Sequence, residues 1–297
     1  MTEGTTDGMT ERMAGPVLVF GRTGQLAREL ARHDRVLCLG RDAADLADPA
    51  AAAARIAEIR PSAVINAAAH TDVDGAEAAE ALAMRINAEA PAALARAAAA
   101  LDIPFVTVST DYVFDGTGTR PWRPDDPPAP LGAYGRSKLA GERAVARAGG
   151  RWAVLRTSWV VSAHGRNFIR TMLRLGRERG AVRVVADQIG APTPAAALAQ
   201  ACLVVARTLA VRPERAGLYH FAGTPDTSWA DFARAIFAAA GMAVEVTDIA
   251  TADWPTPARR PLNSRLDCTA TTAAFGLARP DWRAALPDIL TEIGANP

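Results

Sequence analysis

Residues 17–27 read VLVFGRTGQLA, an apolar run followed by a glycine turn. The run predicts a buried strand, and the turn predicts the start of a helix. Gly21, Gly24 and Ala27 have the spacing G-x-x-G-x-x-A. In a dinucleotide-binding turn the first glycine permits the tight bend, the second lets the backbone approach a pyrophosphate, and a small third residue lets helix and strand pack closely. The stretch therefore favours a dinucleotide site over an ordinary glycine turn.

Strand and helix patterns alternate through the first half of the chain. Short, fully apolar strands that alternate with helices are typical of a parallel sheet covered on both faces, which is an α/β fold. The expected strands are 16–20, 36–39, 63–66, 104–108 and 152–156, and the expected helices are 24–32, 49–59, about 75–101 and 133–148.

The pattern loosens after residue 157. Helices are expected at 167–179, 194–209 and 229–240, and strands at 182–185 and 218–221. We expect residues 15–165 to form the nucleotide-binding domain, with later segments free to return to it, and residues 166–297 to form mainly a smaller C-terminal substrate-binding lobe. Residues 1–14 read as a disordered tail or as sequence before the native start. The loop 115–130 is rich in Gly, Pro and Asp, and its length favours a functional or mobile segment.

Composition excludes several classes of protein. The chain has 297 residues and a net charge of +1, so no electrostatic footprint indicates nucleic acid or a membrane surface as a partner. The three cysteines are far apart and the four histidines lack metal-ligand spacing, which argues against a disulfide framework or a metal site. No apolar stretch reaches the ~20 residues of a membrane span, and the N-terminus lacks the apolar region of a signal peptide. The expected setting is a reducing cytoplasm.

Two arginines bear on the choice of cofactor. An NAD-selective site usually has an acidic residue at the end of the second strand, but this chain has Arg41 there and Arg22 in the glycine turn. Guanidinium groups suit a 2′-phosphate, so the sequence favours NADPH, with NADH as the alternative. The alternative interpretation is that Arg41 is an ordinary surface arginine. Asp45 and Leu46 either cap the next element or flank the adenine.

Three small residues follow the third strand. Ala67, Ala68 and Ala69 leave room for a cofactor to lie across the sheet edge. Packing beneath a helix explains these alanines nearly as well.

The sequence YGRSK at 134–138 carries the catalytic hypothesis. Tyr134 and Lys138 lie four residues apart, so a helix presents both on one face. A Tyr-x-x-x-Lys pair is common by chance, but here it follows the glycine turn and a strand that ends in Ser-Thr. We expect Tyr134 to be a general acid whose pKa is lowered by Lys138, which also binds the nicotinamide ribose. Thr110 is expected to hydrogen-bond the substrate carbonyl.

Several longer motifs then resemble a known family. GRTGQLA, NAAAHTDVDGAE, STDYVFDG, YGRSKLAGE, RTSWV, NFIRTMLRL, DQIGAPT and RRPLNSRLD are similar, in order and spacing, to the dTDP-4-dehydrorhamnose reductases of the extended short-chain dehydrogenase/reductase superfamily. The resemblance extends from about Val17 to the C-terminal region. It implies a Rossmann-like, doubly wound domain and the reduction of dTDP-6-deoxy-L-lyxo-4-hexulose to dTDP-L-rhamnose, a sugar donor for cell-surface polysaccharide.

The resemblance also assigns residues by motif. The catalytic set is Thr110, Tyr134 and Lys138. The cofactor turn comprises Gly21, Arg22, Thr23, Gly24, Gln25 and Leu26. Asp111, Tyr112 and Trp159 look like substrate-site residues, and Gln188, Arg260 and Asn263 are further candidates for contacts to the nucleotide sugar. Some relatives use magnesium at a dimer contact, but no compact carboxylate cluster in the sequence predicts it here. Monomer and homodimer both stay open.

Other activities are weighed against the reductase. Related sugar-nucleotide dehydratases carry Thr-Asp-Glu where this chain has Thr110, Asp111 and Tyr112, and a tyrosine is a poor substitute for the glutamate that takes a proton. An epimerase or another 4-ketoreductase acting on a related nucleotide sugar is the alternative enzyme. A cofactor-binding regulatory subunit without catalysis is the alternative outside enzymes, and the intact catalytic set argues against it.

Overall fold

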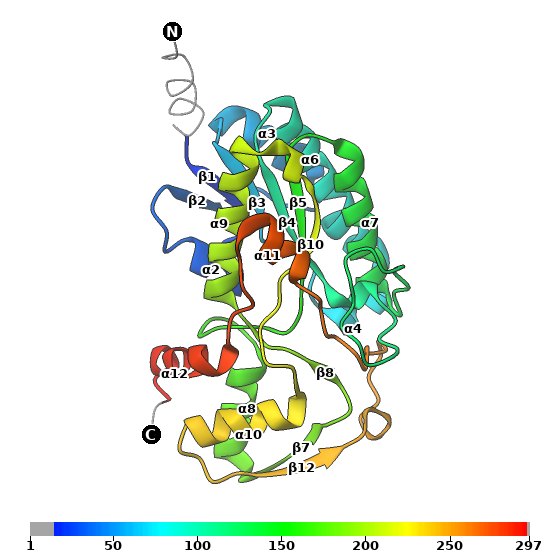
Figure 1. Ribbon diagram of the computed structural model, residues 1–297, viewed down its shortest axis with the longest axis vertical. Helices are drawn as coiled ribbons and strands as arrows, with labels where there is room; N and C mark the ends of the chain where they lie inside the picture. Colours follow the sequence, from blue (N-terminus) through cyan, green and yellow to red (C-terminus); the bar gives the residue numbers. More distant parts are fainter. Residues whose placement is uncertain (1–14, 296–297) are drawn as a thin grey trace.

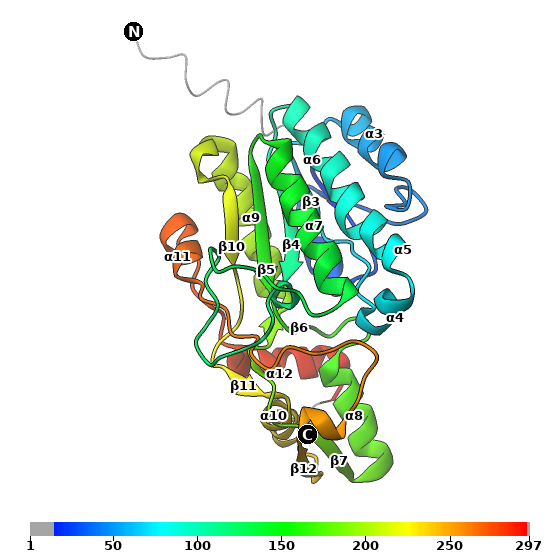
Figure 2. The ribbon, with the colours of Figure 1, turned by 90° about the vertical axis from the view of Figure 1, so that its right-hand side faces the viewer.

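The computed structural model describes residues 15–295 (Figure 1). The tail predicted at 1–14 lies outside the described residues. Two parts are visible in Figures 1 and 2: a larger part built on a sheet, and a smaller part beyond one end of the sheet's strands.

Six parallel strands form the central sheet. In spatial order they are β10 (Gly217–His220), β5 (Trp152–Thr157), β4 (Phe105–Thr110), β3 (Ala63–Asn66), β1 (Val17–Phe20) and β2 (Val36–Leu39). After β1 the chain moves outward to β2 and then returns past β1 to β3, so the strand order reverses between β1 and β3. Such a reversal opens a crevice at the carboxyl ends of the strands, where ligands bind in folds of this kind.

Helices cover both faces of the sheet (Figure 2). Side chains alternate along the strands, so Val19 and Ile65 enter one core while Leu18 and Val64 enter the other. One face carries α2 (Gln25–Leu30) and α9 (Ala195–Val211), and the other carries α3 (Pro49–Ile59), α6 (Ala90–Ala100) and α7 (Ala133–Ala148). The predicted α/β class and doubly wound parallel sheet are therefore confirmed.

The helix expected at about 75–101 is not continuous. It consists of α4 (Val73–Ala78), α5 (Glu80–Met84), a π-helical turn at Arg85–Glu89 and α6. Within that turn the Asn87 amide donates to the His70 carbonyl and to the Ser137 hydroxyl, both at 3.0 Å. A side chain at Gly141 would collide with the Asn87 carbonyl, so α7 packs directly on this turn.

The smaller part has its own apolar core. Its elements are α8 (Phe168–Arg179), β7 (Ala181–Val185), α10 (Trp229–Ala239), β12 (Glu245–Ile249) and α12 (Trp282–Ile293). β12 pairs in parallel with β7, and the two lie side by side at the end of the molecule in Figure 1. The sequence analysis did not predict β12, α11 (Thr269–Phe275) or α12.

The long loop 115–130 is packed against the rest of the protein. The Trp122 ring stacks on Phe114, with centroids 4.5 Å apart, and its backbone N–H donates to the Arg265 carbonyl at 2.9 Å. The Asn263 amide donates to the Arg120 carbonyl at 2.8 Å. These contacts tie the loop to the segment that follows β12.

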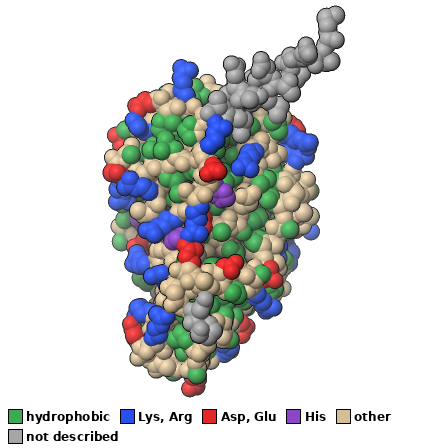
Figure 3. Space-filling model, turned by 90° about the vertical axis from the view of Figure 1, so that its left-hand side faces the viewer, with side chains coloured by type: hydrophobic (Ala, Val, Ile, Leu, Met, Phe, Trp, Pro, Cys, Tyr) green, Lys and Arg blue, Asp and Glu red, His purple; other side chains and the backbone are tan. Residues whose placement is uncertain are grey.

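The surface carries mixed charge. Figure 3 shows a face on which Lys and Arg side chains are interspersed with Asp and Glu. Within residues 15–295, no helix combines the length and apolar character needed to span a bilayer.

Candidate active site

A cleft of about 700 Å³ opens at the carboxyl ends of the sheet strands. Its walls include the turn after β1, the ends of β4 and β5, and the first turn of α7, together with residues from the smaller part. The cleft therefore lies at the point where the strand order reverses, as the parallel topology leads us to expect.

The glycine turn lines one side of the cleft. Gly21 has φ +122°, a conformation that L side chains rarely adopt, and a Cβ there would lie 3.4 Å from the backbone of Ala67 and Ala68. Thr23, Gly24, Gln25 and Leu26 line the cleft. A Cβ on Gly24, which caps the N-terminus of α2, would meet open space. The exposed backbone at this helix N-terminus fits a pyrophosphate group, since free N–H groups and the helix dipole both favour an anion.

The two arginines predicted near the cofactor lie just outside the cleft lining. Arg22 forms an exposed ion pair with Asp42 at 2.9 Å. A Cβ on Gly40 would come within 2.9 Å of the Arg22 guanidinium, so the glycine at the end of β2 makes room for it. Arg41 is exposed beside this pair.

Asp45 and Leu46 contribute to the local fold. The Asp45 carboxylate accepts from the Ala47 backbone N–H at 2.9 Å and so closes a local turn. Leu46 is buried in the core on the α3 side of the sheet. Of the three alanines after β3, Ala67 and Ala69 line the cleft, whereas Ala68 packs against that same core.

Thr110, Tyr134 and Lys138 all line the cleft. Thr110 is the last residue of β4, and its hydroxyl accepts from the Tyr112 backbone N–H at 3.2 Å. Tyr134 is in the first turn of α7, and Lys138 follows one turn later. The Lys138 ammonium donates to the Val108 carbonyl at 2.7 Å. The structure thus brings together the three side chains that the sequence predicts to be catalytic.

The acidity expected for Tyr134 is wrong. Burial raises its pKa to about 12, and a hydrogen bond with Thr110 opposes that shift only in part. Burial also lowers the pKa of Lys138 to about 8, while the charge of Glu142 acts in the opposite direction. The ammonium one turn away favours the phenolate, but burial removes water from both groups and favours their neutral forms.

Asp111, Tyr112 and Trp159 line the same cleft. The Tyr112 ring lies edge-on to Tyr134, with centroids 5.5 Å apart. Trp159 follows β5 and stacks on Trp229.

The other predicted substrate contacts lie outside the cleft lining. The Gln188 amide donates to the Thr251 hydroxyl at 3.1 Å. Arg260 forms an ion pair with Asp74 of α4 at 2.8 Å. Asn263 is buried and holds the loop 115–130, as described above.

Half of the residues that line the cleft were not predicted from the sequence. More than half of these residues lie in motifs quoted above, such as RTSWV, but were given no role there. Leu198 in α9 and Trp229 at the start of α10 lie in no quoted motif, and only the packing of their helices brings them to the cleft. The residues that were not predicted are Thr71, Val73, Val108, Ser109, Thr157, Ser158, Val160, Gly165, Arg166, Asn167, Leu198 and Trp229.

Asp111 makes stability depend on pH. Burial raises its pKa from 3.8 to about 6, although hydrogen bonds from Ser264 and Thr110 oppose the shift. Because the folded pKa lies above the unfolded one, the protonated carboxyl stabilises the fold fully below about pH 4, and this contribution is lost as the pH rises through about 6. As the pH rises across this range, the free energy of unfolding of Asp111→Asn should increase by roughly 1–3 kcal/mol relative to that of the wild type. Urea unfolding from pH 4 to 8 measures this difference in free energy. The same pH dependence of stability in both proteins would refute the raised pKa of Asp111.

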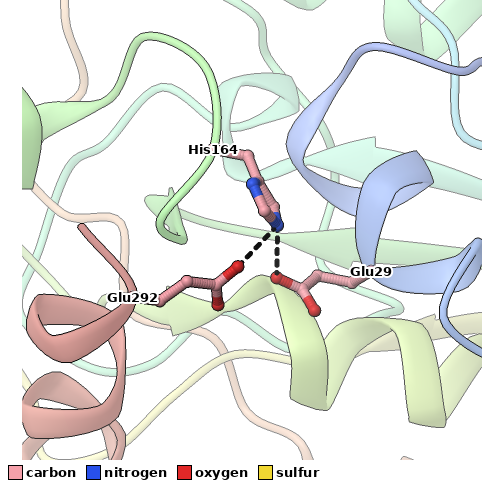
Figure 4. Close-up of side chains that lie close together, drawn as sticks. All are labelled: Glu29, His164 and Glu292. Atoms are coloured by element: carbon pink, nitrogen blue, oxygen red, sulfur yellow. Dashed lines mark ion pairs between the residues drawn. The ribbon is translucent and has the colours of Figure 1, made fainter. Parts of the chain in front are cut away.

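A compact cluster of acidic residues and a histidine joins the two parts of the molecule. His164 Nε2 lies 3.4 Å from a carboxylate oxygen of Glu29 on α2 and 3.4 Å from one of Glu292 on α12 (Figure 4). Their ligand atoms lie within 4.8 Å of one another. The sequence does not reveal this cluster, because its members are widely separated in the chain.

This cluster does not make a magnesium site by itself. Magnesium prefers several oxygen ligands, but here two carboxylates share their surroundings with a histidine nitrogen and the Arg32 guanidinium. The three residues also lie outside the cleft lining, so we derive no step of a reaction from them.

The fold and the cleft are those of a Rossmann-like nucleotide-binding protein of the short-chain dehydrogenase/reductase type. Residues 15–294 match the family model described as RmlD substrate binding domain. The chain belongs to the dTDP-4-dehydrorhamnose reductase family.

Relatives in this family match over most of their length. A dTDP-4-dehydrorhamnose reductase from Burkholderia thailandensis is 45% identical over 91% of this chain and 96% of the relative. The Escherichia coli enzyme of that name is 39% identical over 93% and 97%.

Solved structures of the family are also similar. The reductase from Clostridium acetobutylicum has a TM-score of 0.87 and 34% identity, covering 94% of this chain and 99% of the other. The reductase from Bacillus anthracis, solved in complex with NADP, has a TM-score of 0.86 and 33% identity, covering 94% and 100%.

Proposed function

We propose that this protein reduces the C4 ketone of dTDP-6-deoxy-L-lyxo-4-hexulose with NADPH, giving dTDP-L-rhamnose. The observation that carries this proposal is the meeting of Thr110, Tyr134 and Lys138 in one cleft beside the glycine turn. Membership of the family, and the NADP bound in a similar structure, support the choice of substrate and cofactor.

The glycine turn would hold the cofactor. The N-terminus of α2 binds the pyrophosphate, Gly21 permits the tight bend, and Gly24 lets the backbone approach the pyrophosphate closely. Arg22 and Arg41 bind the 2′-phosphate at the end of β2, which requires Arg22 to exchange its exposed partner Asp42 for the phosphate. Lys138 binds the nicotinamide ribose. When bound, NADPH supplies the hydride for the ketone carbon.

Tyr134 would supply the proton. With its pKa raised to about 12, the phenol stays protonated at neutral pH and can donate to the alkoxide oxygen that forms at C4. The Thr110 hydroxyl, which donates to the Asp111 carboxylate at 3.1 Å in the free protein, would turn to donate to the same oxygen and stabilise the developing charge. Both hydroxyls reach the cleft from elements anchored in the sheet domain, so their positions are set before substrate binds.

Residues at the ends of β4 and β5 would hold the nucleotide sugar together with the smaller part. We assign Asp111, Tyr112 and Trp159 to contacts with the sugar, and residues 166–297 mainly to the substrate-binding lobe, with α9 and β10 returning to the sheet domain. Gln188, Arg260 and Asn263 would act from outside the cleft lining. Arg260 links to α4, Asn263 links to the loop 115–130, and Gln188 bonds to Thr251.

The test is a turnover assay with the keto-sugar made in place. We expect one NADPH consumed for each dTDP-L-rhamnose formed, with NADH a poorer donor. A changed sugar without net consumption of NADPH would show an epimerase instead. Tight binding of NADPH without turnover of any keto-sugar nucleotide would show a regulatory subunit.

Gly21→Ala should weaken NADPH binding. At φ +122° a residue with a Cβ is strained, and the new Cβ would also contact the backbone after β3 at 3.4 Å. We expect a loss of about 1–3 kcal/mol in unfolding free energy together with a weaker NADPH Kd measured by fluorescence. Gly180→Ala is the control, because Gly180 also has positive φ but lies in the smaller part at the end of α8. It should lose stability with the NADPH Kd unchanged, and equal Kd values in all three proteins would refute the role of Gly21.

A further inference from the structure

Trp159 has an unusual backbone conformation. Its φ is +50°, in the left-handed region that bulky side chains rarely occupy. A residue stays in such a conformation only when its surroundings hold it there, and such residues concentrate at functional sites. The contacts that hold Trp159 therefore bear on the cleft that it lines.

Two contacts fix the Trp159 ring. One is with Gly190 of β8 (Ile189–Gly190), where a Cβ would come within 2.9 Å of the indole. The other is with the Trp229 ring, which is nearly parallel at 14° with centroids 3.6 Å apart. That spacing leaves no room for a ligand between the two rings, and together the two contacts restrict the position of the Trp159 ring.

Trp229 is itself anchored in the smaller part. It is the first residue of α10, which Ser228 caps by accepting from the Asp231 backbone N–H at 2.9 Å. Its ring also contacts Phe168 of α8, with centroids 4.5 Å apart. Both helices belong to the core of that part, so the indole pair joins this core to the end of β5.

We propose that Trp229 is a positioning residue that holds the Trp159 indole as a rigid wall of the cleft against the sugar nucleotide. This inference rests on the proposed function for its substrate. Both rings line the cleft together with Tyr134 and Thr110. A flat apolar surface suits the C–H face of a deoxyhexose, and a wall that is already rigid spares the ordering cost on binding.

The role of Trp229 is separate from the cofactor. The glycine turn and the arginines near β2 lie on the sheet domain, whereas the aromatic contacts of Trp229 reach Phe168 and Phe232 in the smaller part. Loss of the Trp229 ring would leave Trp159 without its stacking partner, free to leave its strained conformation. The sugar nucleotide should then bind more weakly while NADPH binds as before.

The experiment compares Trp229→Ala, Trp229→Phe and the wild type, with Trp254→Phe as a control at an exposed tryptophan. The stacked indoles should give an exciton couplet in the circular dichroism of the free wild-type protein, and Trp229→Ala should lose it. We expect Trp229→Ala to raise the KM for the keto-sugar nucleotide about 3- to 10-fold, with kcat and the NADPH Kd nearly unchanged. Trp229→Phe should restore most of the KM, and Trp254→Phe should keep both the couplet and the KM.

Several results would overturn the inference: no couplet in the wild type, an unchanged KM in Trp229→Ala, or equal weakening of NADPH and sugar nucleotide. Should Trp229→Ala fail to fold, Gly190→Ala displaces Trp159 through its other contact and must give the same selective rise in KM. Failure of the proposed function is a different result, because the wild type would then bind NADPH and show the couplet without turning over the keto-sugar nucleotide. In that case sugar-nucleotide affinity measured by calorimetry replaces KM, and an equal Kd in Trp229→Ala and wild type overturns the role of Trp229.

Discussion

Tyr134→Phe is expected to lower kcat by about 10²- to 10⁴-fold, the range that a general acid contributes. The phenol is the group in the cleft that we assign to protonate the C4 alkoxide, and phenylalanine keeps the ring while removing the proton. The ring packs against the apolar cluster formed by α4, α5 and α7, so the fold should be retained. The NADPH Kd should stay within about threefold of the wild-type value. Cofactor binding involves no proton transfer, so removal of the Tyr134 hydroxyl costs it at most one hydrogen bond.

Tyr219→Phe is the matched control for this variant. Tyr219 is on β10 and lies outside the cleft lining. Its hydroxyl donates to the Arg215 carbonyl at 2.8 Å. The control should keep wild-type turnover. Steady-state kinetics and NADPH fluorescence measure both quantities, and unaltered turnover in Tyr134→Phe would contradict the assigned proton donor.

Arg156→Met should cost about 3–5 kcal/mol of unfolding free energy, because it leaves a buried carboxylate without its partner. Arg156 on β5 and Glu142 on α7 form two hydrogen bonds, at 2.6 and 2.9 Å, with side chains 3% and 4% exposed. The Arg156 guanidinium also donates to the Pro124 carbonyl of the loop 115–130 at 3.3 Å. Glu142 lies two turns after Tyr134 on α7, so this pair fixes the catalytic helix to the sheet.

An exposed ion pair offers the comparison. Arg174 and Glu178 on α8 lie 2.8 Å apart, with side chains 60% and 48% exposed. Arg174→Met should change the unfolding free energy by no more than about 0.5 kcal/mol, since solvent screens such pairs. Denaturant unfolding of both variants measures the contrast, and losses of similar size would show that burial does not set the strength of the Arg156–Glu142 pair.

The parts of the fold that the sequence predicts well are governed by local patterns. Fully apolar runs such as residues 63–66 have to be buried on both faces, and in an alternating chain this leads to a parallel sheet. Gly149 ends α7 where the sequence placed its stop. The glycine turn and the Tyr-x-x-x-Lys spacing likewise specify their own geometry, so these residues could be placed at the cleft in advance.

Other features depend on contacts between distant segments. Glu29 and Glu292 meet only because the end of α12 comes close to His164 and to Arg32 beside α2, and nothing near either glutamate in the sequence signals the other. Trp229 reaches the cleft because α10 turns its first residue towards Trp159. The direction of the Tyr134 pKa shift was mispredicted for the same reason, since burial is a property of the packed structure and not of the helix alone.

A crystal structure with NADP and dTDP-L-rhamnose tests the central claim most directly. The proposed mechanism predicts the Tyr134 hydroxyl about 2.6–3.2 Å from the C4 hydroxyl of the sugar, with C4 facing the nicotinamide. A Tyr134 hydroxyl turned away from the sugar, or a sugar bound outside the cleft, would contradict it.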